Sequence, residues 1–224
     1  MKRRTLDLVF AGGGIVVAIL LVVLAFAVAT QYAFASDYVK TELTAQKITF
    51  TAADKLTAEE KSWKPGSACL TTYAGQLMQS GPQAECYASY YIALHMEEAA
   101  KTAGFPGATY ATLGATRTEL TAQVTAAKAK GDTAAAADAQ KKFDAATALR
   151  TTMQTGETLR GLLLTTYGFS VLGDLAGFAA NILYALAGLM VLLSAAGFAH
   201  ALATPQDEIV FSPAPQPRRV SGIA

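Results

Sequence analysis

The sequence predicts an all-α protein with two transmembrane helices and an extracytoplasmic helical domain between them. Two apolar runs carry this prediction: Leu8–Ser36 has no charged residue, and Gly161–Ala203 has one acid and one histidine. Only 16% of the 224 residues are charged, against about 25% in typical soluble domains. Ala and Thr dominate the segment between the runs, and a high Ala content favours helix over strand.

The first run is long enough to cross a membrane. Its 29 residues would form a helix of about 43 Å, and a hydrocarbon core of about 30 Å needs about 20 residues. We therefore expect a cytoplasmic N-terminus at 1–7 and transmembrane helix 1 at 8–36. A cleaved signal peptide stays open, because Ala33-Phe34-Ala35 before Ser36 has the form of a cleavage site. Sequencing the mature N-terminus would distinguish a cleaved signal peptide from a retained transmembrane helix.

The second run is too long for one span. As a helix its 43 residues would extend about 65 Å, twice the hydrocarbon thickness. We assign 175–203 to transmembrane helix 2 and 161–174 to an apolar stalk that packs on the continuation of the first span near 33–43. Asp174 then marks the boundary between membrane and outer domain, where an anchoring role is favoured over proton transfer.

Charge predicts the orientation. Five basic residues flank the two spans on what would be one side of the membrane: Lys2, Arg3, Arg4, Arg218 and Arg219. The positive-inside rule places both termini of this multi-pass bacterial membrane protein in the cytoplasm. Residues 37–160 are then extracytoplasmic. The proline-rich segment 204–224 is predicted to be a disordered cytoplasmic tail.

The first part of the extracytoplasmic domain is expected to contain short helices. Thr57–Glu60 has the pattern of a capping box and predicts a helix start. A second helix is expected over Cys69–Gln79. Pro82 suits the first turn of a third helix that reaches about Ala103. On this helix an apolar stripe recurs at helical spacing, which indicates a core face: Tyr87, Tyr90, Tyr91 and Leu94.

The second part is predicted to be a helical hairpin. Thr116–Glu119 has the form of another capping box and predicts a helix that reaches about Lys130. Gly131-Asp132 is the turn, and Thr133–Met153 returns with small residues on its buried face. Such a face packs closely but gains little from burial, so this hairpin is expected to be mobile or to need a partner.

Cys69 and Cys86 are the only cysteines, and we predict that they form a structural disulfide. An extracytoplasmic compartment is oxidising. One turn between two helices would bring them together, and closing such a short loop is worth about 3 kcal/mol in the chain-entropy model.

Residues suited to catalysis are sparse, and we expect no enzyme, no catalytic residue and no bound metal or cofactor. His95 and His200 are the only histidines, and in the two-span topology they lie a membrane thickness apart, about 30 Å. His95, close to Glu97 and Glu98, is interpreted as a solvated or capping histidine. The net charge of +1 and the lack of basic–aromatic patches exclude a nucleic-acid partner.

Small residues recur at four-residue spacing in the second run. Gly173 and Gly177 form a G-x-x-x-G pattern that Asn181 continues, and such faces let helices approach closely in lipid. We therefore take Gly173, Asp174, Gly177 and Asn181 as candidate interface or packing residues. The partner could be the other span, a second copy or another protein.

Three stretches resemble a family of small actinobacterial membrane proteins of unknown function, some of which are labelled aromatic ring-opening dioxygenases. They are Gly156–Phe169, Val39–Phe50 without Thr44 and Ala45, and Tyr73–Ala84 without Leu77–Ser80. The resemblance implies the two-span topology and leaves out Ala115–Lys142, which has the character of an insertion. It implies no catalytic residue, and the separation of the two histidines argues against the dioxygenase label.

These observations favour a non-enzymatic accessory or scaffold subunit of a bacterial cell membrane. Its partners would be the lipid bilayer and either another membrane or envelope protein or a second copy of the chain. An outward-facing sensor or ligand-binding module that acts through a membrane partner is the alternative.

Overall fold

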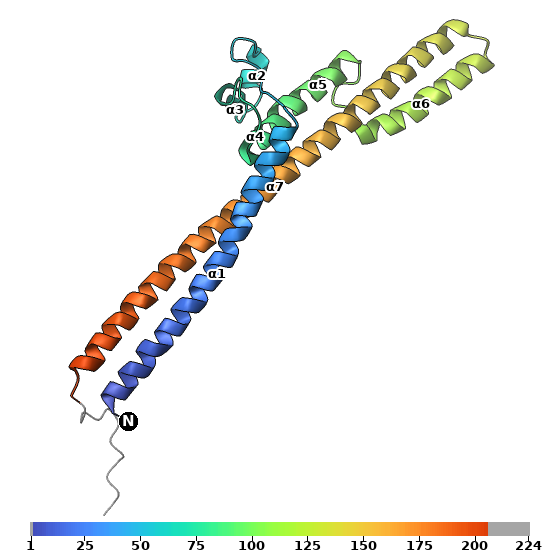
Figure 1. The fold of residues 1–224 in the computed structure, drawn as a ribbon. Helices are drawn as coiled ribbons and strands as arrows, with labels where there is room; N and C mark the ends of the chain where they lie inside the picture. The colour runs from blue at the N-terminus through green and yellow to red at the C-terminus, as the bar shows by residue number, and fades with distance from the viewer. Residues whose placement is uncertain (1, 206–224) are drawn as a thin grey trace, which may run out of the picture. The chain divides into compact units, whose positions relative to one another are not determined.

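The computed structural model describes residues 2–205. It is 81% helix, and a bridge between Thr49 and Leu77 pairs two short extended stretches. The prediction of an all-α chain with two long apolar helices is confirmed. Figure 1 shows the elements in order: α1 (Arg3–Ala45), α2 (Ala58–Ser62), α3 (Ala68–Thr72), α4 (Gly81–Cys86), the π-helical segment η1 (Tyr87–Ile92), α5 (Ala93–Thr102), α6 (Tyr110–Ala129) and α7 (Thr133–Ala203).

The chain forms two compact units. The paired-helix unit combines Met1–Ala33 with Asp174–Ala224, and the central unit is Phe34–Gly173. Within the expected tail at 204–224, residues 206–224 lie outside the described residues.

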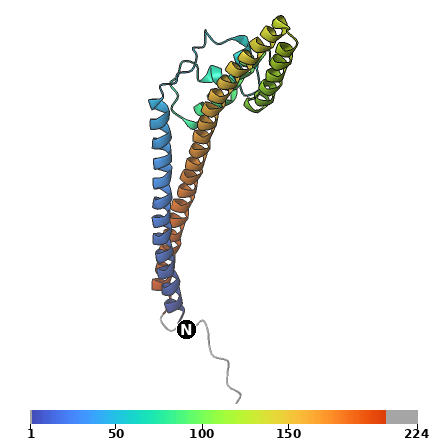
Figure 2. The same cartoon turned by 90° about the vertical axis from the view of Figure 1, so that its right-hand side faces the viewer.

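The paired-helix unit consists of two antiparallel helical segments, one from α1 and one from α7, which lie side by side in both views (Figures 1 and 2). A Cβ placed on Gly197 would lie 3.2 Å from the Cβ of Ala11, and one placed on Gly14 would contact Ser194. At the other end of the pair, a Cβ on Gly177 would lie 3.0 Å from the ring of Tyr32. These contacts show that the two segments run antiparallel, because residues further along α1 contact earlier residues of α7.

Small residues at seven-residue intervals line the contact between these segments, which we call the small-residue seam. Its buried members are Ala11, Ala18 and Ala25 on α1, and Ala180, Ala187, Ser194 and Ala201 on α7. A seven-residue repeat is 3.5 residues per turn, the period of a left-handed helix pair. Small side chains allow the two backbones to approach closely.

The large apolar side chains of this unit face away from the seam. Phe10 is 72% exposed and Leu192 is 69% exposed, whereas Ala25 is fully buried. The most apolar window of α1 is only 22% buried, and that of α7 only 11% buried. The unit is therefore inside-out compared with the core of a soluble protein, with its small residues inside and its large apolar residues outside.

Both long helices extend beyond the segments assigned to the membrane. α1 runs from Arg3 to Ala45 and so includes the expected continuation of the first span, and α7 is one helix of 71 residues. The separate helix expected at 133–153 and the stalk at 161–174 are parts of α7. The segment contains no proline, and a single interior glycine costs only about 1 kcal/mol relative to alanine, so nothing in it ends the helix.

The stalk packs as expected within the central unit. The ring centroid of Phe169 lies 6.4 Å from that of Phe34 and 6.1 Å from that of Tyr38, both edge-on. A Cβ on Gly173 would lie 2.8 Å from the Cβ of Ala35, so the helices nearly touch there.

The connection after α1 contains a short extended stretch that pairs with a second one. Phe50 N–H donates to the Gln76 carbonyl, and Met78 N–H donates to the Ile48 carbonyl. The helix expected over 69–79 is wrong in its length, because α3 ends at Thr72 and Gly75 adopts a left-handed φ of 72°. The capping box at Thr57 is confirmed.

The helical hairpin consists of α6 and the N-terminal part of α7, which lie side by side in both views (Figures 1 and 2). The expected start at Thr116 is wrong: Thr109 caps α6, and Thr116 lies inside the helix, where its hydroxyl donates to the Thr112 carbonyl. Gly131 forms the turn with a φ of 70°, as predicted.

The two hairpin helices are joined by arginine contacts as well as by small residues. Arg117 Nε donates to Thr147 Oγ1 at 2.9 Å, and the Arg150 guanidinium lies 3.8 Å from the centroid of the Tyr110 ring. The core of the central unit includes residues of α1, α3, α4, η1, α5, α6 and α7. Its largest fully buried side chains are Leu70, Met78, Leu94 and Leu113.

Candidate functional site

Cys69 and Cys86 form the predicted disulfide. Their Cα atoms lie 6.1 Å apart, and Cys86 is fully buried. The bond joins the short α3 to α4, whose N-terminus is capped by local contacts. Ser80 accepts from Gln83 N–H, and Pro82 lies in the first turn, as expected. The bond holds α3 on a longer element that the chain can form locally.

The predicted stripe of tyrosines lies on the π-helical segment η1. α4, η1 and α5 follow one another without a gap, so the helix expected from Pro82 to about Ala103 is confirmed with a π-helical middle. The Ala88 carbonyl in this segment accepts from Arg160 Nε of α7 at 3.1 Å. π-helical turns within α-helices are frequent at functional sites, which makes this part of the central unit the candidate site.

A row of neighbouring rings runs along this segment. The centroid of Phe50 lies 5.4 Å from that of Tyr87, Tyr87 lies 4.6 Å from Tyr91, and Tyr91 lies 4.2 Å from His95. Burial, reinforced by the neighbouring Tyr91, raises the pKa of Tyr87 to about 12. The tyrosines therefore form a core face, as the sequence indicates, and the row leads outward to a histidine.

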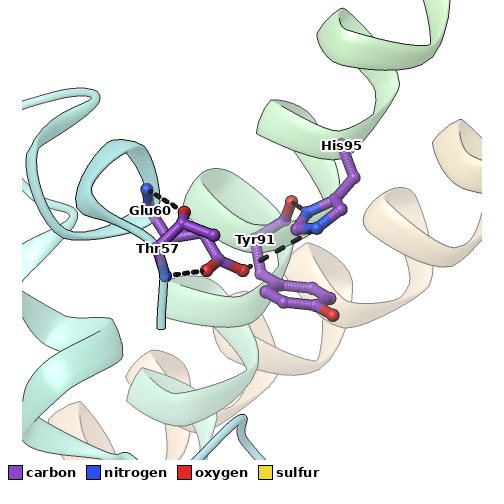
Figure 3. A network of polar contacts seen from close by, with 4 residues as sticks. All are labelled: Thr57, Glu60, Tyr91 and His95. Atoms are coloured by element: carbon purple, nitrogen blue, oxygen red, sulfur yellow. Dashed lines mark hydrogen bonds and ion pairs between the residues drawn. The ribbon is translucent and has the colours of Figure 1, made fainter. Parts of the chain in front are cut away.

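His95 links α5 to the N-terminus of α2 through Glu60. Figure 3 shows the network: His95 Nδ1 lies 2.8 Å from the Tyr91 carbonyl oxygen, and Nε2 lies 3.7 Å from Glu60 Oε1. The other oxygen, Glu60 Oε2, accepts from Thr57 N–H at 2.7 Å. The Glu60 side chain is 7% exposed and that of His95 is 43% exposed.

Both ring nitrogens of His95 face oxygen atoms, the Tyr91 carbonyl oxygen at Nδ1 and a carboxylate oxygen of Glu60 at Nε2. The buried Glu60 carboxylate in turn has a polar group beside each of its oxygens, the Thr57 N–H and the His95 ring. Burial of a carboxylate without such partners would be costly.

A groove of about 500 Å³ runs beside His95, which lines it together with Tyr91 and Met96 on one side and Thr152, Thr155 and Gly156 on the other. A Cβ on Gly156 would contact Met96, so the absence of a side chain there allows α5 and α7 to approach. The hydroxyls of Thr152 and Thr155 donate to carbonyls of their own helix. Their hydroxyl oxygens can still accept hydrogen bonds from a ligand.

Glu60 is the member of this network that sequence reasoning missed. The capping pattern identified it as a helix-start residue, but His95 was assigned to Glu97 and Glu98 by proximity in sequence. Glu97 instead pairs with Lys101 at 2.9 Å, which lowers the pKa of Glu97. The sequence has no signal that joins positions 60 and 95.

The candidate interface residues fall into two groups. Gly173 is buried and Gly177 half-buried, and both lie against α1 residues of their own unit. Asp174 and Asn181 are exposed, and the side chain of neither has a hydrogen bond or ion pair within residues 2–205. Gly173 and Gly177, four residues apart, therefore both lie against α1, and the small-residue seam beyond them repeats every seven residues.

His200 has a partner of its own in the paired-helix unit. Its Nδ1 lies 3.1 Å from Asp7 Oδ2, and Thr204 Oγ1 lies 3.3 Å from the same nitrogen. The two histidines thus belong to separate networks in separate units. Across residues 2–205 there is no cluster of three or more metal-ligating side chains.

No family model, no curated protein and no solved structure matches the chain.

Proposed function

We propose that this protein crosses a bacterial cell membrane twice and acts there as a non-enzymatic accessory or scaffold subunit that presents the central unit on the extracytoplasmic side. In this proposal both termini are cytoplasmic, and a membrane or envelope protein, or a second copy of the chain, is the partner. The family resemblance carried by the stalk and the connection after α1 agrees with it.

The inside-out packing of the paired-helix unit carries the proposal. A seam of alanines buries little apolar surface, whereas Phe10, Leu192 and their neighbours are largely exposed. In water such a surface would be unfavourable by about 25 cal/mol per Å². In a bilayer the same side chains are solvated by lipid, and close backbone approach is what favours helix association.

A binding role rather than catalysis is supported by the titratable groups. Outside the spans, the carboxyl and ammonium groups with shifted pKa values belong to the exposed helix pairs Glu97–Lys101 and Asp138–Lys142, and the raised pKa of Tyr87 follows from its burial. These have an ordinary structural explanation.

Single-cysteine labelling tests the topology. The native cysteines are bonded to each other, so an introduced cysteine is the only thiol. In intact cells a membrane-impermeant maleimide should label Lys130→Cys in the hairpin, and should label Lys2→Cys only after permeabilisation. The reverse pattern, or labelling of both in intact cells, would refute the orientation.

Purification in a mild detergent from native membranes tests the accessory role. We expect a second protein, or a second copy, at a fixed ratio to the 23.4 kDa chain. A homogeneous single copy without a partner would contradict it.

The groove beside His95 supports a ligand-binding module as the second candidate. Its aromatic, imidazole and threonine groups suit an uncharged, hydroxyl-bearing ligand. A neutral sugar that raises the melting temperature of the intact protein, but not that of the Thr152→Val variant, would favour this role.

A further inference from the structure

A second groove lies between α1 and α7 within the central unit, and we call it the α1–α7 groove. Its volume is about 480 Å³, within the range of about 300–1,000 Å³ that is usual for small-molecule sites. Most of its lining is apolar, and the polar members are Glu42, Gln46, Thr165 and Thr166.

The groove exists because the residues between the helices change in size. Where Ala35 meets Gly173, the helices nearly touch. Further along, the buried positions between them are occupied by larger residues, Val39, Leu43 and Leu163. Larger side chains require a wider separation of two helices than Ala and Gly do. Leu159 and Leu162 line the space at the side, and Leu162 is 62% exposed.

The chemistry of the lining suits an apolar chain. None of the described residues that line it is Lys or Arg, and its one charge is the carboxylate of Glu42. Thr165 and Thr166 already donate their hydroxyl hydrogens to the Gly161 and Leu162 carbonyls. An anionic group would find no cation and few donors in this groove, whereas a hydrocarbon chain would cover exposed leucine.

The position of the groove in the sequence indicates the source of such a chain. Phe169, at one end of the lining, comes six residues before the predicted span at Leu175, which is about 9 Å of helix. Phe34, Tyr38 and Phe169 form a ring cluster there, and aromatic clusters of this kind are typical of the lipid headgroup level.

We propose that the α1–α7 groove binds the acyl chain of a membrane lipid. The chain extends past the cluster of Phe34, Tyr38 and Phe169 and lies against Leu159 and Leu162, and the lipid headgroup stays outside the groove at the level of the ring cluster. This inference rests on the proposed membrane location of the protein.

A photoreactive phosphatidylcholine tests the proposal. The full chain is reconstituted into nanodiscs that contain this lipid, with the reactive group at the end of the acyl chain, and labelled residues are mapped by mass spectrometry. We expect labelling at Leu159 and Leu162, in addition to labelling at lipid-facing Leu175 and Phe178.

Two matched variants give the control. In Leu162→Trp the indole displaces about two methylenes of the lipid chain, so labelling in the groove should fall about tenfold, while labelling at Leu175 and Phe178 stays unchanged. Leu172→Trp makes the same substitution on α7 at an exposed position outside the groove. It should leave labelling in the groove unchanged.

The outcomes separate this inference from the proposed function. If the wild-type protein enters nanodiscs and is labelled along its spans but not in the groove, the lipid proposal is wrong and the membrane proposal stands. A protein segment that cross-links in the groove in place of lipid also overturns it. If the protein does not enter nanodiscs, both proposals fail.

Discussion

A designed disulfide between the two segments of the paired-helix unit provides the sharpest test of the small-residue seam. Gly14 and Ser194 lie opposite each other, and both can be changed to cysteine. A Cβ built on Gly14 lies 3.6 Å from the Cβ of Ser194. Disulfides have Cβ–Cβ distances of about 3.5–4.5 Å. The pair Gly14→Cys and Ser194→Cys should therefore oxidise without movement of either helix.

The matched control moves one cysteine by a single residue. A Cβ on Gly13 has no neighbour within 4 Å, because it points about 100° away from the seam on a helix of 3.6 residues per turn. Gly13→Cys combined with Ser194→Cys has the same number of thiols at nearly the same depth, and it should not form the bond.

Mass spectrometry after tryptic digestion without reduction provides the readout. The bond would join the peptide 5–40 to the peptide 161–218, which no native bond connects, because Cys69 and Cys86 lie in neither. Equal cross-linking in the Gly13 and Gly14 pairs, or none in the Gly14 pair, would refute the register of the seam.

Three further predictions concern stability, each read from thermal unfolding of the purified protein. Ala25→Leu overpacks the seam and should lower the free energy of unfolding by about 1–3 kcal/mol. Ala27→Leu, at an exposed position of the same helix, should leave it nearly unchanged. Equal effects of the two substitutions would contradict the seam. Glu60→Ala removes a helix cap and the partner of His95, and it should lower the free energy of unfolding by about 1–2 kcal/mol. Glu59→Ala, at the exposed neighbouring position, should lower it less. A larger loss for Glu59→Ala than for Glu60→Ala would rule out the network. Because the pKa of Tyr87 is raised from 10.0 to about 12 in the folded protein, its contribution to stability is complete below pH 10 and is lost as the pH rises toward 12; Tyr87→Phe should remove this loss, and an unchanged alkaline profile would exclude Tyr87 as its source.

Local patterns predicted the elements that depend on neighbouring residues. The capping box at Thr57, the helix start at Pro82 and the turn at Gly131 were all predicted, because each depends on backbone preferences within four residues. The helix start predicted at Thr116 was wrong because several threonines lie close together in this segment and each could cap a helix. The one that does so is Thr109. The capping box at Thr109 uses Thr112 as its reciprocal residue, where the usual pattern has Glu or Gln.

Contacts between distant parts of the chain were harder to predict. The four-residue pattern of Gly173, Gly177 and Asn181 is easy to recognise because glycine is uncommon within helices. Alanines at seven-residue spacing are difficult to recognise in a chain that is rich in alanine. The pairing of Glu60 with His95 depends on how α2 is held against α5, which no local pattern encodes, and the grooves depend on side-chain sizes across two helices.

The uniformity of the small-residue seam has a consequence for how the two segments find their alignment. Sliding one segment by seven residues, about 10.5 Å, would again place the repeated small residues of the two helices side by side, so the seven-residue repeat alone does not select one alignment. The ends are different from each other. The ring of Tyr32 fits against Gly177 at one end, and Asp7 pairs with His200 at the other. A slipped pair would lose both contacts at once, so a few end residues select one alignment from a set of near-equivalent ones.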